Sequence, residues 1–143
     1  MKGIHPLLSH TILLALGLTA MGLITFSVSM SLNGTERNLV FTELRFFANS
    51  AKDSVIEAYA LANQSSNYTT GLFQLNLPEK IGNKKYSITL KDGELMANMT
   101  VRGEPLGVVL GMPIDAKMNG TRFMPSSILL EKKDGKISIG LVE

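Results

Sequence analysis

A long uncharged segment near the N-terminus constrains the fold of this chain more than any other feature. After Lys2, no formally charged side chain occurs before Glu36. Within that stretch, residues 7–30 are apolar, glycine or small hydroxyl residues, and His10 is their only titratable group. A membrane-crossing helix needs about 20 apolar residues, whereas the apolar core of a secretory signal has only about 7–15. The segment therefore predicts a helix that can cross a bilayer.

The composition limits what the rest of the chain can do. About 108 of the 143 residues follow the uncharged stretch, which is enough for one small domain. The net charge is only +2 and the basic residues are scattered, so we expect no nucleic-acid partner. Cysteine is absent, which excludes disulfides and thiolate metal sites, and both histidines lie near the N-terminus. We therefore expect neither an enzyme nor a cofactor or metal site.

The helical pattern continues beyond the uncharged stretch, but its character changes. We expect one long helix over residues 4–62, hydrophobic over 4–32 and amphipathic over 33–62. Asn33-Gly34 is its weak point, because glycine costs about 1 kcal/mol relative to alanine inside a helix. A kink, a melted turn or hinge is expected there. The amphipathic stripe recurs at three- and four-residue steps, at Val40, Leu44, Phe47, Ala51, Val55, Ala58 and Ala62.

An isolated helix of this length would leave its apolar side chains exposed to water. It must pack on the chain's own C-terminal domain, on copies of itself, or on both; the alternative is a stalk between a single anchor and an outer domain. Small residues let helices approach closely. The residues that we expect to pack in the core of an assembly are Leu7, Leu14, Leu16, Gly17, Gly22, Phe26, Leu44 and Phe47.

After a polar linker, apolar residues recur at every second position instead of at helical spacing. We assign residues 63–71 to the linker and residues 72–143 to a β-rich outer domain. Asp92-Gly93 and Asp134-Gly135 are strong signals for two-residue hairpin turns. The first turn predicts the pairs Leu90 with Leu95, Ile88 with Ala97 and Tyr86 with Met99. The second predicts Leu130 with Ile139, Ile128 with Leu141, and Glu131 opposite Ser138.

Each hairpin has one wholly apolar face, which implies two packed layers or a small barrel. Short strands are also expected over residues 72–77, 106–110 and 122–124. The predicted fold class is therefore α+β: a long N-terminal hydrophobic α-helix followed by a small antiparallel β-sandwich or barrel.

Five Asn-x-Ser/Thr sequons indicate exposure to an N-glycosylating machinery outside the cytoplasm. Only about one or two would be expected by chance from the nine asparagines of the chain. Lys2 precedes the apolar run, which also favours an outward C-terminal portion. For any single site, a simple turn explains Asn-Gly about as well. The sequons lie at Asn33, Asn63, Asn67, Asn98 and Asn119, and N-linked glycans are the only non-protein groups that we expect.

The N-terminal stretch GIHPLLSHTILL resembles the start of archaeal type IV pilins and archaellins. The resemblance covers the apolar helix closely, and LPEKIG followed by YSI is similar to the first strands of their β domains. It implies a class III signal that prepilin peptidase cleaves between Gly3 and Ile4, leaving residues 1–3 as a short leader. His5 stands where Ser is common in the family. Leu8 stands where bacterial pilins usually have Glu, which favours the archaeal branch.

The resemblance implies a structural subunit of an archaeal type IV pilus-like filament, with a glycosylated β domain that serves adhesion. Its expected partners are copies of itself, prepilin peptidase and a pilus assembly platform. The expected location is the cytoplasmic membrane before assembly and an extracellular filament afterwards. The alternatives are an archaellin of a motility filament, and a membrane-anchored surface protein or minor pilin. An extracellular enzyme ranks behind both, and neither His10 nor the pair Asp53 and Glu57 has partners that indicate a catalytic site.

Overall fold

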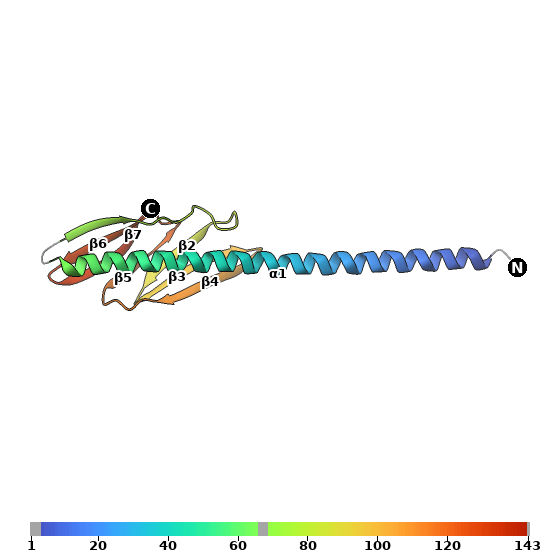
Figure 1. Cartoon of the computed structure of the whole chain (residues 1–143), viewed down its shortest axis with the longest axis horizontal. Helices are drawn as coiled ribbons and strands as arrows, with labels where there is room; N and C mark the ends of the chain where they lie inside the picture. Colours follow the sequence, from blue (N-terminus) through green and yellow to red (C-terminus); the bar gives the residue numbers. More distant parts are fainter. Residues whose placement is uncertain (1–3, 66–68, 143) are drawn as a thin grey trace. The chain divides into compact units, whose positions relative to one another are not determined.

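The described part of the chain contains one long helix followed by seven strands (Figure 1). The computed structural model describes residues 4–65 and 69–142, with side chains described for 10–65 and 70–142. The elements are α1 (Ile4–Gln64), β1 (Thr69–Gln74), β2 (Tyr86–Lys91), β3 (Glu94–Val101), β4 (Glu104–Gly111), β5 (Lys117–Phe123), β6 (Ser127–Lys133) and β7 (Lys136–Val142). α1 and β1 both extend into the range 63–71 that the composition assigned to a linker.

The chain divides into two compact units, Met1–Asn38 and Leu39–Glu143. The first contains the uncharged part of α1. The second contains the rest of α1 and all seven strands. The hydrophobic core of the described residues lies entirely in the second unit.

In the second unit, the C-terminal part of α1 packs against the sheet along a stripe of small side chains (Figure 1). The stripe keeps the predicted three- and four-residue steps but runs through Ala48, while Phe47 is only half-buried beside it. Alanine lets a helix lie close to a sheet because little side chain separates the two backbones. The buried members are Val40, Leu44, Ala48, Ala51, Val55, Ala58 and Ala62.

The seven strands form a single sheet in the order β1-β6-β7-β5-β2-β3-β4. Neighbouring strands are antiparallel except β5 and β7, which pair in parallel through Lys117–Ser138 and Met118–Ile139. β4 lies at one end of this order, where Pro105 is tolerated because an edge strand has unpaired backbone groups. The apolar side chains of the strands join the α1 stripe in one core.

Both predicted hairpins have the expected register. Leu90 pairs with Leu95 and Leu130 with Ile139, so each hairpin turns its apolar face toward the core. Asp92 and Gly93 both have positive φ, 48° and 84°, as the tightest hairpin turn requires. Arg102-Gly103 makes a third turn of this kind, with φ of 53° and 83°, and it lengthens β4 beyond the predicted strand.

The α+β fold class is confirmed, with a long N-terminal helix and a mostly antiparallel β domain. The expectation of a β-sandwich or barrel needs correction. The second layer over the apolar face of the sheet is α1 itself, because its stripe already covers the inward side chains of both hairpins. A second sheet is then unnecessary.

Specific contacts hold α1 on the sheet at both ends of the stripe. The turn at Gly82 lies against Val40: a Cβ added to Gly82 would be 2.7 Å from Val40 Cγ2. At the other end, Lys132 of β6 donates hydrogen bonds from Nζ to the carbonyls of Ala62 (3.0 Å), Asn63 (3.4 Å) and Ser65 (2.6 Å). The carbonyl of Ala62 also accepts a hydrogen bond from the backbone N–H of Ser65 at 3.2 Å. The last carbonyls of a helix need such partners from outside it, and the ammonium also complements the helix dipole.

Tyr86 holds the loop that precedes β2. Its side chain is fully buried, and its hydroxyl donates a hydrogen bond to the carbonyl of Pro78 at 2.7 Å. Burial raises the pKa of Tyr86 to about 12, because the phenolate would lose its hydration. The neutral phenol is therefore part of the folded β domain.

Candidate assembly surface

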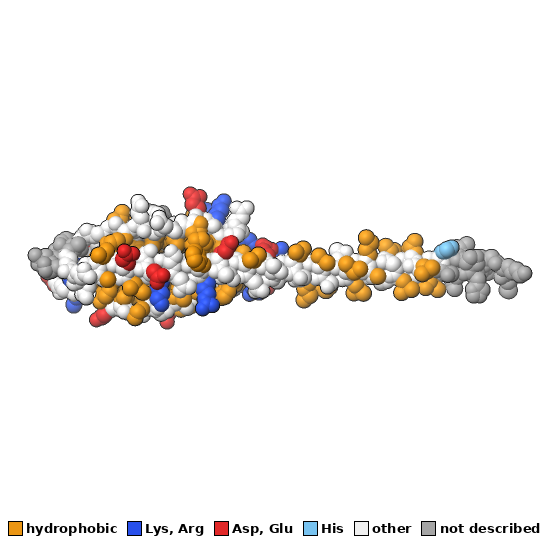
Figure 2. All heavy atoms as spheres, in the orientation of Figure 1, with side chains coloured by type: hydrophobic (Ala, Val, Ile, Leu, Met, Phe, Trp, Pro, Cys, Tyr) orange, Lys and Arg blue, Asp and Glu red, His pale blue; other side chains and the backbone are white. Residues whose placement is uncertain are grey.

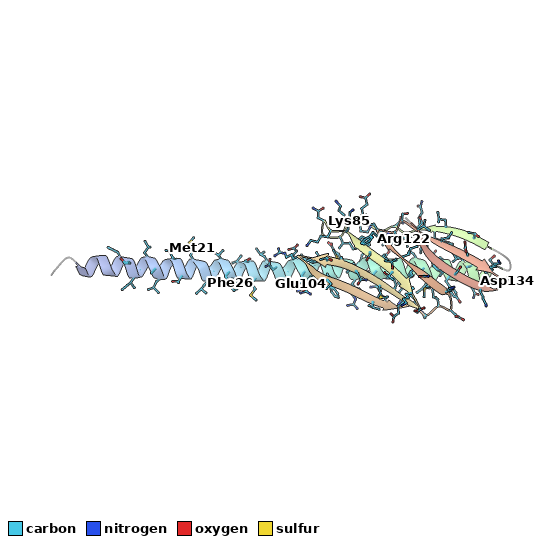
Figure 3. All side chains as sticks on the ribbon, turned by 180° about the vertical axis from the view of Figure 1, so that it is seen from behind. Met21, Phe26, Lys85, Glu104, Arg122 and Asp134 are labelled. Atoms are coloured by element: carbon cyan, nitrogen blue, oxygen red, sulfur yellow. The ribbon has the colours of Figure 1, made fainter. Side chains whose placement is uncertain are left out.

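The most unusual surface of the molecule is the first part of α1, where large apolar side chains are exposed around the helix. Figure 2 shows those on one face. Met21 and Phe26 project from the helix in Figure 3 and are 69% and 68% exposed. A helix that is apolar all round must be covered by lipid or protein. The exposed members are Ile12, Leu13, Leu14, Leu16, Leu18, Met21, Leu23, Ile24, Phe26, Val28, Met30 and Leu32.

Two threonine hydroxyls of this segment do not oppose burial, because they are bonded within the helix. The hydroxyl of Thr19 donates to the carbonyl of Ala15 at 2.6 Å, and that of Thr25 donates to Met21 at 2.8 Å. Hydroxyls bonded to the preceding turn can enter an apolar environment with little loss of hydrogen bonding. The segment is therefore chemically suited to a membrane or to a bundle of helices.

α1 is also the one helix in the described residues that is long and apolar enough to span a membrane. A long apolar N-terminal helix of this kind indicates membrane insertion or secretion, and its exposure indicates packing with lipid or other subunits. The β domain carries the second half of the same helix in its core. This architecture is pilin-like.

Comparison with protein-family models, with curated proteins and with solved structures finds no match to the chain. No family is therefore assigned by similarity. The pilin-like description rests on the arrangement of α1 and the sheet, and any finer function has to be argued from the site.

The structure separates the residues predicted to pack in an assembly core into two groups. Leu14 and Leu16 are exposed, and nothing lies within 4 Å of a Cβ added to Gly17 or Gly22. Leu44 is completely buried in the chain's own core, so its assignment to an assembly surface is corrected. Phe47 is half-buried against that core, and Phe26 belongs to the exposed group. Leu7 has no described side chain.

The predicted hinge lies within a continuous helix. Residues 33 and 34 are helical, as are the residues on both sides, so the melted turn is not present. A Cβ added to Gly34 would meet no atom within 4 Å, so packing does not explain the glycine. A bend at Asn33-Gly34 remains a prediction.

Four of the five sequon asparagines, Asn33, Asn63, Asn98 and Asn119, lie in the described residues, and all four are exposed. Asn98 is on β3, opposite Ser87 of β2, and faces away from the core as the hairpin register predicted. Asn67 lies outside the described residues. Glycosylation of each site remains a prediction.

The processing site is only partly described. Gly3 lies outside the described residues, and Ile4 is the first residue of α1. Cleavage between them therefore remains a prediction. His10 is exposed on the helix, as are Asp53 and Glu57 one turn apart on the second half of α1.

Within residues 4–65 and 69–142, no group of three or more His, Asp or Glu side chains is placed to hold a metal. The expectations of no enzyme and no cofactor stay predictions. The sequence interpretation missed exposed apolar residues of the β domain, among them Leu72 (63%) and Phe123 (65%). The alternation of side chains along β1 could have indicated that Leu72 is exposed. Phe123 was harder to place, because β5 begins at Lys117 and only residues 122–124 were predicted as a strand.

Proposed function

We propose that this chain is the structural subunit of an extracellular filament of the archaeal type IV pilus class. Residues 4–32 of α1 would form the filament core, and the glycosylated β domain would form the outer surface used in adhesion. The observation that supports this most is the exposure of twelve large apolar side chains between Ile12 and Leu32. Each gains about 1.5–3 kcal/mol on leaving water, so this segment is stable only when covered.

The physical basis of assembly is an exchange of environments. Lipid and apolar side chains solvate this helix about equally well, so the gain on assembly comes from closer packing and not from the hydrophobic effect. Gly17 and Gly22 leave open space on the helix surface, which allows neighbouring helices to approach. Before assembly the same segment would be stored in the cytoplasmic membrane, where prepilin peptidase would cut between Gly3 and Ile4. An assembly platform would then extract it.

The β domain contains part of the same helix that would form the filament core. The α1 side chains from Val40 to Ala62 that form the buried stripe belong to the core of this domain. The sequon asparagines Asn98 of β3 and Asn119 of β5 are exposed, which supports a glycosylated exterior. We propose no enzymatic activity, no cofactor and no nucleic-acid partner.

One observation supports a second candidate function. A single helix with the length and composition of α1 also suits a permanent membrane anchor, as in a surface protein or minor pilin. An archaellin would share the filament architecture but drive motility. Shearing separates these cases: a major subunit is enriched in sheared filaments, whereas an anchored protein stays with the membranes.

The test introduces a charge into the exposed part of α1. Leu14→Lys should abolish filaments seen by electron microscopy of sheared material, because an unpaired ammonium inside a helix bundle is strongly unfavourable. The matched control is Leu72→Lys on β1, a residue of similar exposure in the β domain, 63% against 67% for Leu14. Filaments should persist in the control.

Mass spectrometry of the sheared protein completes the test. An N-terminal Ile4 in filaments supports the proposal, and an intact Met1 found only in membranes supports the anchor. Normal filaments from Leu14→Lys would contradict the proposed core.

A further inference from the structure

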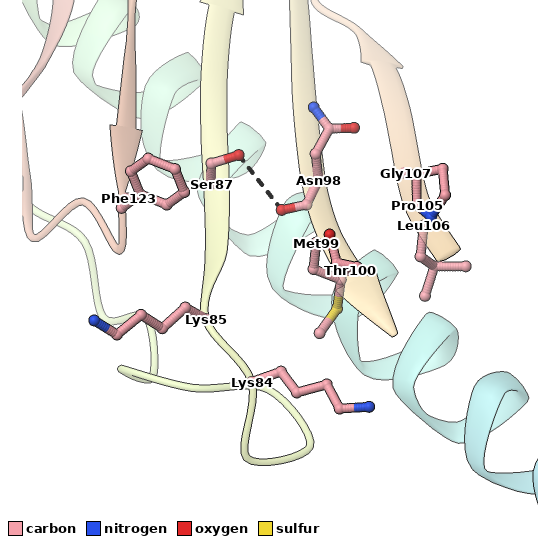
Figure 4. A pocket seen from close by; sticks show the side chains of 10 residues that line it. All are labelled: Lys84, Lys85, Ser87, Asn98, Met99, Thr100, Pro105, Leu106, Gly107 and Phe123. Carbon is pink, nitrogen blue, oxygen red and sulfur yellow. Dashed lines mark hydrogen bonds between the residues drawn. The ribbon is translucent and has the colours of Figure 1, made fainter. Parts of the chain in front are cut away.

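The outer face of the sheet, turned away from the α1 stripe, carries a shallow trough across four strands (Figure 4). Phe123 of β5 pairs with Ser87 of β2, Ser87 with Asn98 of β3, and Asn98 with Gly107 of β4. One residue from each strand therefore lies in a single row. The trough has a volume of about 550 Å³.

The sizes of these four residues create the trough. Ser87 is small and Gly107 has no side chain, so little side chain rises above the sheet at these two positions. The ring of Phe123 bounds the depression at one end, and the neighbouring residues of β4 bound it at the other. A Cβ added to Gly107 would lie 2.6 Å from Asn98 Oδ1. The missing side chain thus leaves the space that the Asn98 carboxamide occupies.

The Asn98 carboxamide is available for modification. Within the described part of the chain, the side-chain amide of Asn98 has no hydrogen-bond partner. The neighbouring Ser87 Oγ donates instead to the backbone carbonyl of Asn98, at 3.4 Å. By contrast, the amide of Asn49 donates to the carbonyl of Arg45 at 2.9 Å. Thr100, which completes the Asn98 sequon, is exposed on the same face and also lines the trough.

We propose that the trough is the binding site for the first sugars of an acidic glycan attached to Asn98. This inference rests on the glycosylation included in the proposed function. The donor is a lipid-phosphate-linked oligosaccharide. Its anomeric C–O bond breaks as a C–N bond forms to Asn98 Nδ2, the phosphate leaves with the electron pair, and the amide loses one proton.

The geometry fits a glycan that lies across the strands. Neighbouring strands are about 4.8 Å apart, so Phe123 is about 10 Å from Asn98, within reach of the first linked sugars. The sugars pass over Ser87, whose small side chain leaves room for a ring. The apolar face of a ring then packs on Phe123, which is 65% exposed without it.

The charges around the trough select the chemical class of the sugar. Lys84 and Lys85 are among the residues that line it, and no carboxylate is. Figure 4 shows both lysines at the end of the trough near the start of β2. A sugar that carries a carboxylate or sulfate gains charge-assisted hydrogen bonds from such ammonium groups. A neutral glycan can accept hydrogen bonds from them through its hydroxyl oxygens but lacks the opposite charge, so it gains less.

The second sequon of the sheet offers an internal comparison. Asn119 also lines a groove, of about 250 Å³. That groove has no aromatic residue, and Glu131 lines it together with Lys117. A glycan on Asn119 therefore has no aromatic ring to pack on, and the charged groups around it have both signs. We expect this glycan to extend into solvent.

The test compares thermal unfolding of the full-length chain, extracted in detergent from a host that glycosylates it. Phe123→Ala should lower the Tm by about 2–4 °C more in the chain with Asn98 than in Asn98→Gln, because the ring contacts the glycan only when it is attached. In the Asn119→Gln background, the effect of Phe123→Ala should stay as large as in the wild type. Lys85→Gln should reduce the glycan-dependent part of the Tm, and added salt should have the same effect.

Glycopeptide mass spectrometry on the same samples distinguishes the possible failures. An unmodified Asn98 beside other modified sequons overturns the inference alone, whereas the absence of a glycan at every sequon also overturns the proposed glycosylation. A modified Asn98 with no coupling to Phe123 overturns the trough alone, and a neutral glycan overturns the proposed acidic class. Filament formation is scored separately by electron microscopy, so its failure is independent of these results.

Discussion

The exposed apolar residues in the first half of α1 and the buried stripe in its second half differ in side-chain size. Residues 10–32 carry leucine, isoleucine, methionine and phenylalanine on all sides, whereas the buried stripe after Val40 contains four alanines. A helix that lies close to a sheet has little space between the two backbones, so its buried side chains must be small. Lipid tails and neighbouring helices adapt to larger ones. Residue size along the helix thus separates the part built for the chain's own fold from the part built for other molecules.

The largest expected effect tests this separation directly. Leu44→Ala should lower the free energy of unfolding of the β domain by about 2–5 kcal/mol, because it leaves a cavity in a fully buried site. Leu14→Ala removes the same atoms from an exposed site and should leave the domain's stability unchanged. Urea unfolding of the full-length chain in detergent, followed by tyrosine fluorescence, measures both.

Equal losses of unfolding free energy in Leu44→Ala and Leu14→Ala would contradict the division of α1 into a buried part and an exposed part. The exposed segment would then contribute to the stability of the β domain. The tyrosines report on the domain because all three, Tyr59, Tyr68 and Tyr86, belong to its sequence range.

Local features of the fold could be predicted from the sequence because neighbouring residues determine them. The Asp92-Gly93 turn sets the pairing of Leu90 with Leu95, and no distant contact is needed for that register. The apolar run and the helical steps after Val40 likewise follow from short-range periodicity.

Features that depend on distant residues could not be predicted. The parallel pairing of β5 with β7 and the choice of α1 as the second layer depend on contacts between segments far apart in the chain. Lys132 binds the carbonyl of Ala62, 70 residues away, and no local pattern marks it. The trough at Asn98 was hidden for the same reason, since Gly107 and Phe123 reach it from other strands.

Alkaline pH should also separate the two regions. The pKa of Tyr86 is about 12 in the folded chain and about 10 when unfolded, so above pH 10 the unfolded state releases a proton that the folded state keeps. The stability of the β domain should therefore fall between pH 10 and pH 12, by up to about 2–3 kcal/mol. Residues 11–35 carry no titratable side chain, so this part of the exposed segment does not respond in this range.

Tyr86→Phe is the matched variant for the pH experiment. It removes the hydroxyl, and with it the hydrogen bond to the Pro78 carbonyl, so its stability at pH 8 should be lower by about 1 kcal/mol. Its further decline from pH 10 to pH 12 should be smaller than in the wild type. Parallel curves for the two proteins would show that the ionisation of Tyr86 does not cause the alkaline loss.

The smallest expected effect concerns the segment between the two regions. Gly34→Ala should strengthen the helix by about 0.5–1 kcal/mol, because alanine restricts the unfolded backbone and the added Cβ meets no atom within 4 Å. Amide hydrogen exchange at residues 34–38 should then slow by about 2–5-fold in the full-length chain. The sequon at Asn33 is kept, since the middle position of a sequon accepts alanine. Unchanged exchange would mean that this part of α1 is already rigid and that Gly34 is not a point of bending.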